Sequence, residues 1–198
     1  MTGQTHTTMA DQTTDPLPNA LVVDDEKEVA DAYALRLRGL CDVNTVYGGR
    51  EALAAIEDGE IDIVLLDRHM PQMSGDDVLE ELNDREFPGR IIMITAIDPN
   101  FGVLSMPFDE YLCKPVDRED VRAAVEQQCT ILGYETLGEY FSLEAKIGVI
   151  ESELSAERRE DHDEYQSAKV RSQRLEERVN RLLDDVESLT EYFESIDR

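Results

Sequence analysis

Residues 63–67 read Ile63-Val64-Leu65-Leu66-Asp67, four apolar residues followed directly by an aspartate. Two further stretches have the same form, Ala20 to Val23 before Asp24 and Asp25, and Ile91 to Ile94 before Thr95. Continuous apolar runs of this length are typical of parallel strands that are covered on both faces. Weaker runs at 43–46 and 108–112 complete a predicted set of five strands.

The segments between these runs have the periodicity of amphipathic helices. Positions on one helix face share apolar character in each gap, as in Val29, Tyr33, Leu37 and Leu40, or in Val121, Val125 and Leu132. Alternating strands and helices over residues 19–133 predict a doubly wound, flavodoxin-like α/β fold with a parallel sheet in the order 2-1-3-4-5. The segment 98–107 carries two prolines and a glycine, so at most two helical turns are expected there.

The pattern changes after Gly133, and residues 134–198 read as a separate helical domain. Apolar residues step by three and four over 140–154 and again over 175–196, which indicates a heptad seam. Asp161 to Glu164 predicts a capping box that restarts a helix. Two arrangements remain open, a helical hairpin that turns near 156–163, which we favour, and one long helix that dimerises through the seam.

The chain has 198 residues and a formal net charge of −26, from 45 acidic and 19 basic residues. Only Lys27, Lys114, Lys146 and Lys169 are lysines. Excess carboxylate with few lysines favours a halophilic protein that folds in molar salt, where charges are screened over about 3 Å, although an ordinary acidic protein is the alternative.

Several classes of protein are disfavoured by the composition. No apolar stretch approaches the length of a membrane span, and residues 1–18 lack the apolar centre of a secretory signal, so they are expected to be a disordered tail of a cytoplasmic protein. The three cysteines are far apart and have no metal-ligand spacing, so buried free thiols are expected.

Polar residues follow the predicted strands where the strands end. Asp24 and Asp25 follow the first, Asp67 the third, Thr95 the fourth and Lys114 the fifth. Ligands of open α/β sheets bind beyond the carboxyl ends of the strands, where the winding reverses. Three close carboxylates repel each other unless a cation lies between them, and Mg²⁺ is the hard cation that prefers such oxygens. One aspartate could then attack phosphorus, with the hydroxyl and the ammonium stabilising the transferred phosphoryl group.

Four motifs in this order resemble the receiver domain of two-component response regulators. They are Leu21 to Glu26, Leu65 to Pro71, Ile94 to Ala96 and Asp109 to Pro115, within a similarity that covers about 19–133. The resemblance implies a protein that is not an enzyme acting on external substrates but accepts a phosphoryl group from a sensor histidine kinase.

The resemblance also implies a role for each site residue. Asp67 is expected to be the phosphoacceptor, and Asp24, Asp25, Asp67 and the backbone carbonyl of His69 the Mg²⁺ ligands. The side chain of Lys114 is expected to contact the phosphoryl group. The peptide bond between Lys114 and Pro115 is expected to be cis. Thr95 and Tyr111 resemble the switch pair, in which the hydroxyl moves to the phosphoryl group and the aromatic ring follows.

A different aspartyl-phosphate enzyme, of the haloacid dehalogenase type, is disfavoured. That family has a second aspartate two residues after the first, and His69 stands at that position.

Residues 134–198 resemble the HalX domain of haloarchaeal regulators, which implies transcriptional output. Arg171, Arg174, Arg178 and Arg181 line one helix face, and they could contact DNA phosphates or form pairs within the helix. The alternative output is a protein-interaction adaptor without DNA contact, and a homodimer through the helical tail is a further expectation.

Overall fold

The structure is a computed structural model, and it describes residues 16–184 and residue 186. Five parallel strands form one sheet in the order β2-β1-β3-β4-β5. The strands are β1 (Asn19–Val23), β2 (Asp42–Val46), β3 (Ile63–Leu66), β4 (Arg90–Thr95) and β5 (Glu110–Cys113). The predicted fold class and strand order are therefore confirmed.

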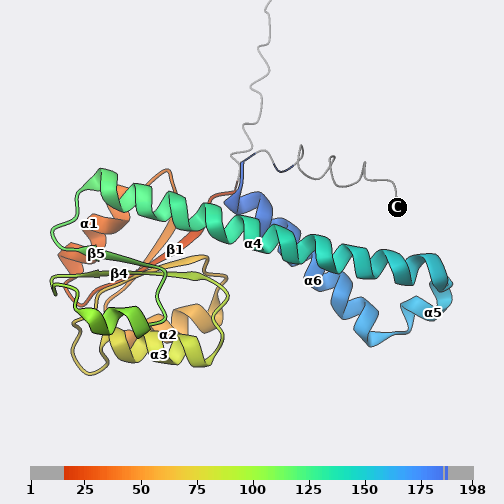
Figure 1. The fold of residues 1–198 in the computed structure, drawn as a ribbon, viewed down its shortest axis with the longest axis horizontal. Helices are drawn as coiled ribbons and strands as arrows, with labels where there is room; N and C mark the ends of the chain where they lie inside the picture. Colours follow the sequence, from red (N-terminus) through yellow and green to blue (C-terminus); the bar gives the residue numbers. More distant parts are fainter. Residues whose placement is uncertain (1–15, 185, 187–198) are drawn as a thin grey trace, which may run out of the picture.

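Helices cover both faces of this sheet (Figure 1). They are α1 (Lys27–Leu37), α2 (Gly49–Asp58), α3 (Gly75–Asp84) and α4 (Arg118–Glu153). The 3-10 turn η1 (Phe101–Ser105) buries none of its residues. The short η1 occupies the segment for which the sequence predicted at most two turns.

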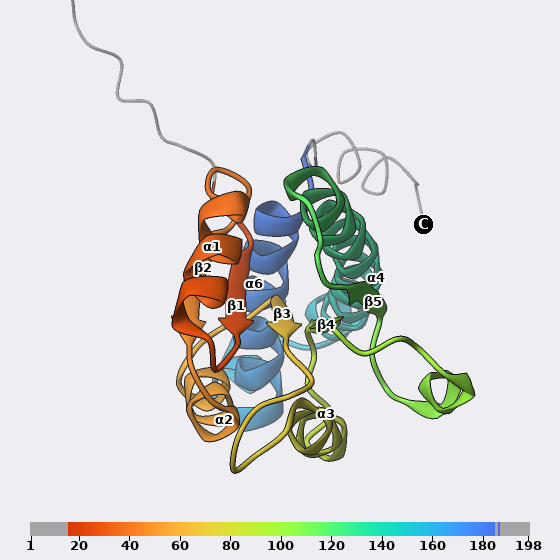
Figure 2. The same cartoon turned by 90° about the vertical axis from the view of Figure 1, so that its left-hand side faces the viewer.

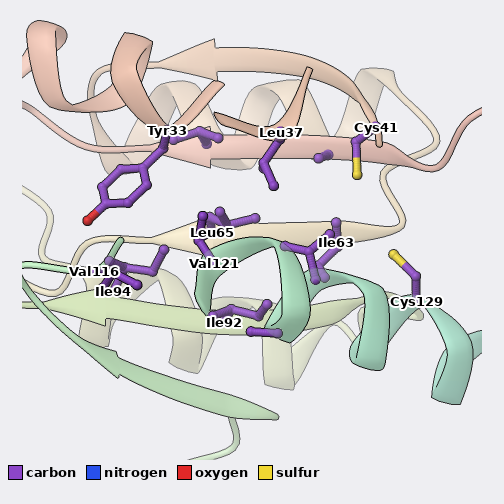
Figure 3. Packing of buried hydrophobic residues seen from close by; sticks show 14 of the residues in the cluster. Tyr33, Leu37, Cys41, Ile63, Leu65, Ile92, Ile94, Val116, Val121 and Cys129 are labelled. Carbon is purple, nitrogen blue, oxygen red and sulfur yellow. The ribbon is translucent and has the colours of Figure 1, made fainter. Parts of the chain in front are cut away.

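The two faces of the sheet take alternate residues of each strand, as the two-residue period of a strand requires. On β3, Ile63 and Leu65 pack under α1 and α4, whereas Val64 and Leu66 pack against the helices of the opposite face. Figure 3 shows Tyr33 and Leu37 of α1 directed toward the sheet in the first of these clusters. Every residue of β3 is buried, which explains its unbroken apolar sequence.

Side chains cap the starts of two helices. Ser74 and Asp77 form a capping box at α3, and Asp117 accepts hydrogen bonds from the backbone at the start of α4. A helix does restart within 161–164 as predicted, at Asp163, but the predicted capping box is wrong, because the N-cap His162 makes no side-chain cap hydrogen bond.

The helical tail is a hairpin. After α4 the chain turns through α5 (Ala156–Glu160) and returns along α4 as α6 (Asp163–Leu182), as Figures 1 and 2 show. The hairpin prediction is thus confirmed over the described residues, and the end of the predicted seam, 187–196, lies outside them. Val179 and Leu182 of this seam are buried.

Helix α4 runs without interruption across Gly133, where the sequence pattern changed. A Cβ at Gly133 would lie 2.5 Å from Leu183 Cγ, so this position serves close packing of two helices rather than a break in one. The hairpin consequently extends beyond the sheet on helix α4, whose first turns pack in the core of the α/β domain (Figure 1).

Two of the cysteines, Cys41 and Cys129, are buried free thiols as expected, and Cys113 is exposed. Within the described residues, no helix combines the length and the apolar character needed to cross a membrane.

Candidate functional site

Three aspartates meet at the carboxyl edge of the sheet. Asp24 and Asp25 follow β1, Asp67 follows the adjacent β3, and one carboxylate oxygen from each lies within 4.8 Å of the others. Asp24 and Asp67 are buried, whereas Asp25 is exposed. The cluster predicted from the strand ends is therefore assembled by the pairing of β1 with β3.

Lys114 reaches this cluster from the end of β5. Its Nζ donates to Asp24 Oδ2 at 2.7 Å and to Asp67 Oδ1 at 2.9 Å. The backbone supports this placement, because Lys114 N donates to the Thr95 carbonyl at 2.8 Å and the Lys114–Pro115 peptide bond is cis, as predicted. One ammonium therefore joins two buried carboxylates that come from different strands.

Burial and this ion pair shift the pKa values in the site. Burial raises the pKa of Asp67 above its ordinary value of 3.8, against the opposing influence of the Lys114 ammonium. Burial acts to lower the pKa of Lys114, but hydrogen bonds to Asp24 and Asp67 outweigh it and raise that pKa. Lys114 is thus held in its charged form at neutral pH.

The loop after β3 fixes the second oxygen of Asp67. His69 N donates to Asp67 Oδ2 at 2.9 Å, and the side chain of His69 is exposed. Gly75 N donates to the Arg68 carbonyl at 2.9 Å, and a Cβ at Gly75 would lie 2.2 Å from the Asp67 carbonyl oxygen. Only glycine allows α3 to begin this close to the backbone of the aspartate.

Thr95 and Tyr111 are connected through one residue of the loop after β4. Ile97 N donates to Thr95 Oγ1 at 3.3 Å, and Tyr111 Oη donates to the Ile97 carbonyl at 2.8 Å. Thr95 is 1% exposed, and the Tyr111 ring packs on Phe108 with centroids 5.5 Å apart. A movement of the Thr95 side chain would therefore disturb its hydrogen bond with Ile97, and through Ile97 the position of the Tyr111 hydroxyl.

The donor atoms of the cluster fit a hard divalent cation. All are carboxylate oxygens, and three negative charges face the single positive charge of Lys114. Mg²⁺ is commonly held by one or two carboxylates together with water and a phosphate oxygen. Asp24, Asp25 and Asp67 could therefore hold such an ion, and the His69 carbonyl stays a predicted ligand.

The predicted row of arginines lies on α6. Arg178 and Arg181 bind Asp62, and Arg171 pairs with Glu139 of α4, whereas Arg174 is exposed. These pairs connect α6 to other elements, unlike the pairs within the helix that the sequence suggested as an alternative. DNA contact by the row stays a prediction.

Two contacts in the structure were not predicted from the sequence. Arg68 binds Asp76 at the start of α3 through Nε and Nη2, with both shortest distances at 2.9 Å. Asp62, which precedes β3, is fully buried between cations from α6. Arg68 and Asp76 belong to different elements, and Asp62 is more than 100 residues from its arginines. The periodicity of a single helix or strand therefore could not reveal either contact.

Comparison with known proteins places these features in a family. A family model described as the response regulator receiver domain matches residues 20–126, and one described as the HalX domain matches residues 130–197. A Haloferax volcanii protein whose name assigns it to transcriptional regulation is 44% identical over 142 residues, which are 71% of this chain and 24% of that protein. This haloarchaeal relative and the HalX match support the salt-adapted interpretation of the composition.

Other relatives match the receiver part. The transcriptional regulatory protein CutR of Streptomyces coelicolor is 38% identical over 109 residues, 53% of this chain and 50% of that protein. The chain thus spans about half the length, or less, of these two curated relatives.

Solved receiver domains have the same fold. The receiver domain of a LuxO-type repressor from Vibrio parahaemolyticus has a TM-score of 0.59 and 27% identity, and covers 62% of this chain and 98% of its own. The Thermotoga maritima response regulator TrrA, solved with Mg²⁺-BeF, has a TM-score of 0.52 and 30% identity over 57% of this chain and 99% of its own. The chain therefore belongs to the response regulator receiver family, and the part that follows its receiver domain matches the HalX domain model.

Proposed function

We propose that this response regulator accepts a phosphoryl group on Asp67 from a sensor histidine kinase and passes the change to its helical C-terminal domain. The observation that carries the proposal is the ion pair of Lys114 with both Asp24 and Asp67, at the edge where β1 and β3 end. This arrangement combines a nucleophilic carboxylate with a fixed positive charge.

In the proposed reaction, a carboxylate oxygen of Asp67 attacks the phosphorus of a phosphohistidine. The new oxygen–phosphorus bond forms as the nitrogen–phosphorus bond breaks, and the imidazole leaves with its electron pair and takes a proton from solvent. The hydrogen bond from His69 N orients the carboxylate. Lys114 and the Thr95 hydroxyl then donate to the phosphoryl oxygens, where charge develops.

A Mg²⁺ ion held by Asp24, Asp25 and Asp67, with the carbonyl of His69, would neutralise charge on the transferred group. The protein's own contribution is to keep Asp67 buried and oriented, and to supply Lys114 as a fixed donor. Hydrolysis of the resulting acyl phosphate returns Asp67 to the carboxylate.

The signal would leave the site through Thr95 and Tyr111. When Thr95 turns toward the phosphoryl group, it gives up the hydrogen bond from Ile97 N, and the loop that Tyr111 holds is free to rearrange. Transcriptional output is proposed on the names of the relatives. A phospho-dependent adaptor without DNA contact is the second candidate, favoured by the ion pairs that already engage Arg178 and Arg181 of α6.

The proposed domain division is a tail at 1–18, a receiver at 19–133 and a helical domain at 134–198, and the matched ranges 20–126 and 130–197 support it. Most of the tail lies outside the described residues. A cytoplasmic location and a homodimer through the helical domain belong to the same proposal.

The test is phosphorylation by a small phosphodonor such as acetyl phosphate, in molar KCl with Mg²⁺. Asp67→Ala is expected to abolish labelling, while Asp58→Ala, at an exposed aspartate ending α2, is expected to label as the wild type does. Labelling of Asp67→Ala at the wild-type level would remove Asp67 as the acceptor.

A further inference from the structure

The amino edge of the sheet, opposite the phosphorylation edge, contains a second buried carboxylate. Asp62 stands immediately before β3 and is 0% exposed. Its Oδ1 accepts from Arg178 Nε at 2.9 Å, and its Oδ2 accepts from Arg181 Nε at 2.8 Å. Arg181 Nη2 adds a contact to Oδ1 at 3.2 Å, and Asn19 N donates to Oδ2 at 2.9 Å.

These donors show that Asp62 depends on the C-terminal helix. Among the contacts that the described residues make with this side chain, only the Asn19 amide comes from the receiver, and both guanidinium groups come from α6, 116 and 119 residues later in the chain. A carboxylate excluded from water is strongly destabilising unless its charge is paired and its oxygens are hydrogen-bonded. The receiver therefore has a carboxylate whose burial requires α6.

Apolar contacts surround this ionic centre. Val179 is 1% exposed, and Leu182 belongs to the same core cluster as α1, α4 and the sheet. The absence of a side chain at Gly133 leaves room for Leu183 against α4. The end of α6 therefore packs against the receiver core through Leu182.

The charges of the two surfaces are complementary. The chain carries a net charge of −26, yet the face of α6 turned toward the receiver presents Arg178 and Arg181. Glu60 joins Asp62 on the opposing edge, with its Oε2 3.6 Å from Arg181 Nη2. Salt screens exposed charges strongly but affects a buried pair much less, so this attraction persists in molar salt.

We propose that the amino edge of the receiver sheet is a docking surface for α6 of the same chain, with Asp62 as the carboxylate that receives Arg178 and Arg181. The occupant is the chain's own helix because α5 returns α6 along α4, and α4 itself begins inside the receiver core. Two positions of the arginine row are then interdomain contacts rather than contacts for nucleic acid. This inference does not depend on phosphorylation of Asp67.

The experiment is hydrogen exchange of the full chain in molar KCl, read by mass spectrometry over residues 175–182. The variants are Asp62→Asn and the pair Arg178→Gln with Arg181→Gln, and the matched control is Arg174→Gln at an exposed position of the same helix. Both test variants are expected to raise the exchange rate of this segment at least about tenfold, since hydrogen bonds to a charged group are lost, while the control leaves it unchanged.

Combining the variants gives a second readout. Because Asp62 and the two arginines act as one unit, the triple variant is expected to exchange no faster than the more affected of the two parents. Effects that simply multiply would overturn the proposal, as would wild-type protection of 175–182 in both test variants. Hydrogen exchange of residues 63–66 shows whether the receiver itself stays folded. The variant Arg178→Gln with Arg181→Gln leaves the receiver sequence unchanged. Retained protection of 63–66 in this variant, together with lost protection of α6, supports docking.

Two outcomes would assign the helix or the arginines to another partner. Protection of α6 that disappears on dilution of the wild type would mean that a second copy supplies the helix, which overturns docking within one chain. Unchanged protection in the arginine variant, together with loss of DNA crosslinked to it in the cell, would overturn the proposal in favour of nucleic acid contact.

Discussion

Asp62 and Asp67 lie at the two ends of strand β3, and each buried carboxylate is paired with a cation from a distant part of the chain. Asp67 binds Lys114, 47 residues away, and Asp62 binds Arg178 and Arg181, 116 and 119 residues away. The same short strand therefore connects the proposed phosphorylation site to the contact with the C-terminal helix.

Removing Lys114 should disable the site chemically. Lys114→Gln leaves Asp24 and Asp67 buried without their shared counter-charge and removes a donor to the phosphoryl oxygens. Loss of one such donor typically costs about a hundredfold in rate, and we expect a decrease of that order in labelling by acetyl phosphate. Lys169→Gln, on the exposed surface of α6, should label at the wild-type rate. Equal rates for the two variants would contradict the role of Lys114.

Gly75→Ala should destabilise the protein and slow phosphorylation together. The new Cβ would lie 2.2 Å from the Asp67 carbonyl oxygen, so the loop after β3 must shift. We expect a loss of about 1–3 kcal/mol in the free energy of unfolding, measured with denaturant in molar KCl. Gly48→Ala is the control, since nothing lies within 4 Å of a Cβ there. A Gly75→Ala variant as stable as this control would show that the loop tolerates the methyl group.

Stability should depend on pH through Asp67 in a defined direction. Burial raises its pKa above 3.8 in the folded state, so the folded protein binds this proton more readily than the unfolded chain. The contribution of Asp67 to stability therefore grows as the pH falls through the raised pKa. Asp67→Asn should be more stable than the wild type at pH 7, and the difference should shrink as the pH falls. A difference that is constant between pH 7 and pH 4 would contradict the raised pKa.

Divalent cations should be required for labelling. Excess EDTA is expected to abolish the reaction of acetyl phosphate with the wild type, since Lys114 is then the one cation that the described residues pair with the three carboxylates. Asp25→Asn, which removes an exposed member of the cluster, should raise the Mg²⁺ concentration for half-maximal labelling by about tenfold or more. Asp42→Asn, exposed at the start of β2, should leave the Mg²⁺ requirement unchanged. Undiminished labelling in EDTA would exclude the proposed metal role.

Thr95→Ala should separate phosphorylation from signalling. The variant keeps Asp67 and Lys114, so it should still become labelled, though the loop at Ile97 loses its contact with the hydroxyl. The change in hydrogen exchange around Tyr111 that follows phosphorylation in the wild type should be reduced. Thr130→Ala, at an exposed threonine that bonds only its own helix backbone among the contacts described, is the control. An undiminished response in Thr95→Ala would contradict the switch.

The sequence alone determined the sheet and the residues at its carboxyl edge. Apolar runs predict buried strands because parallel strands are covered on both faces, and the residue that follows each run must lie at the same edge. This local rule was sufficient to bring Asp24, Asp67, Thr95 and Lys114 together before any contact was known. The composition of residues 98–107 likewise predicted the short η1, since prolines and glycine disfavour a long helix.

Only the tertiary structure decided how the tail is used. The heptad seam suits a hairpin as well as a dimeric helix, because apolar spacing records that a face is buried but not which helix covers it. Likewise, four arginines on one helix face indicate a basic surface whatever its partner. The burial of Asp62 between Arg178 and Arg181 depends on chain segments more than 100 residues apart, and no periodicity within either segment encodes that pairing.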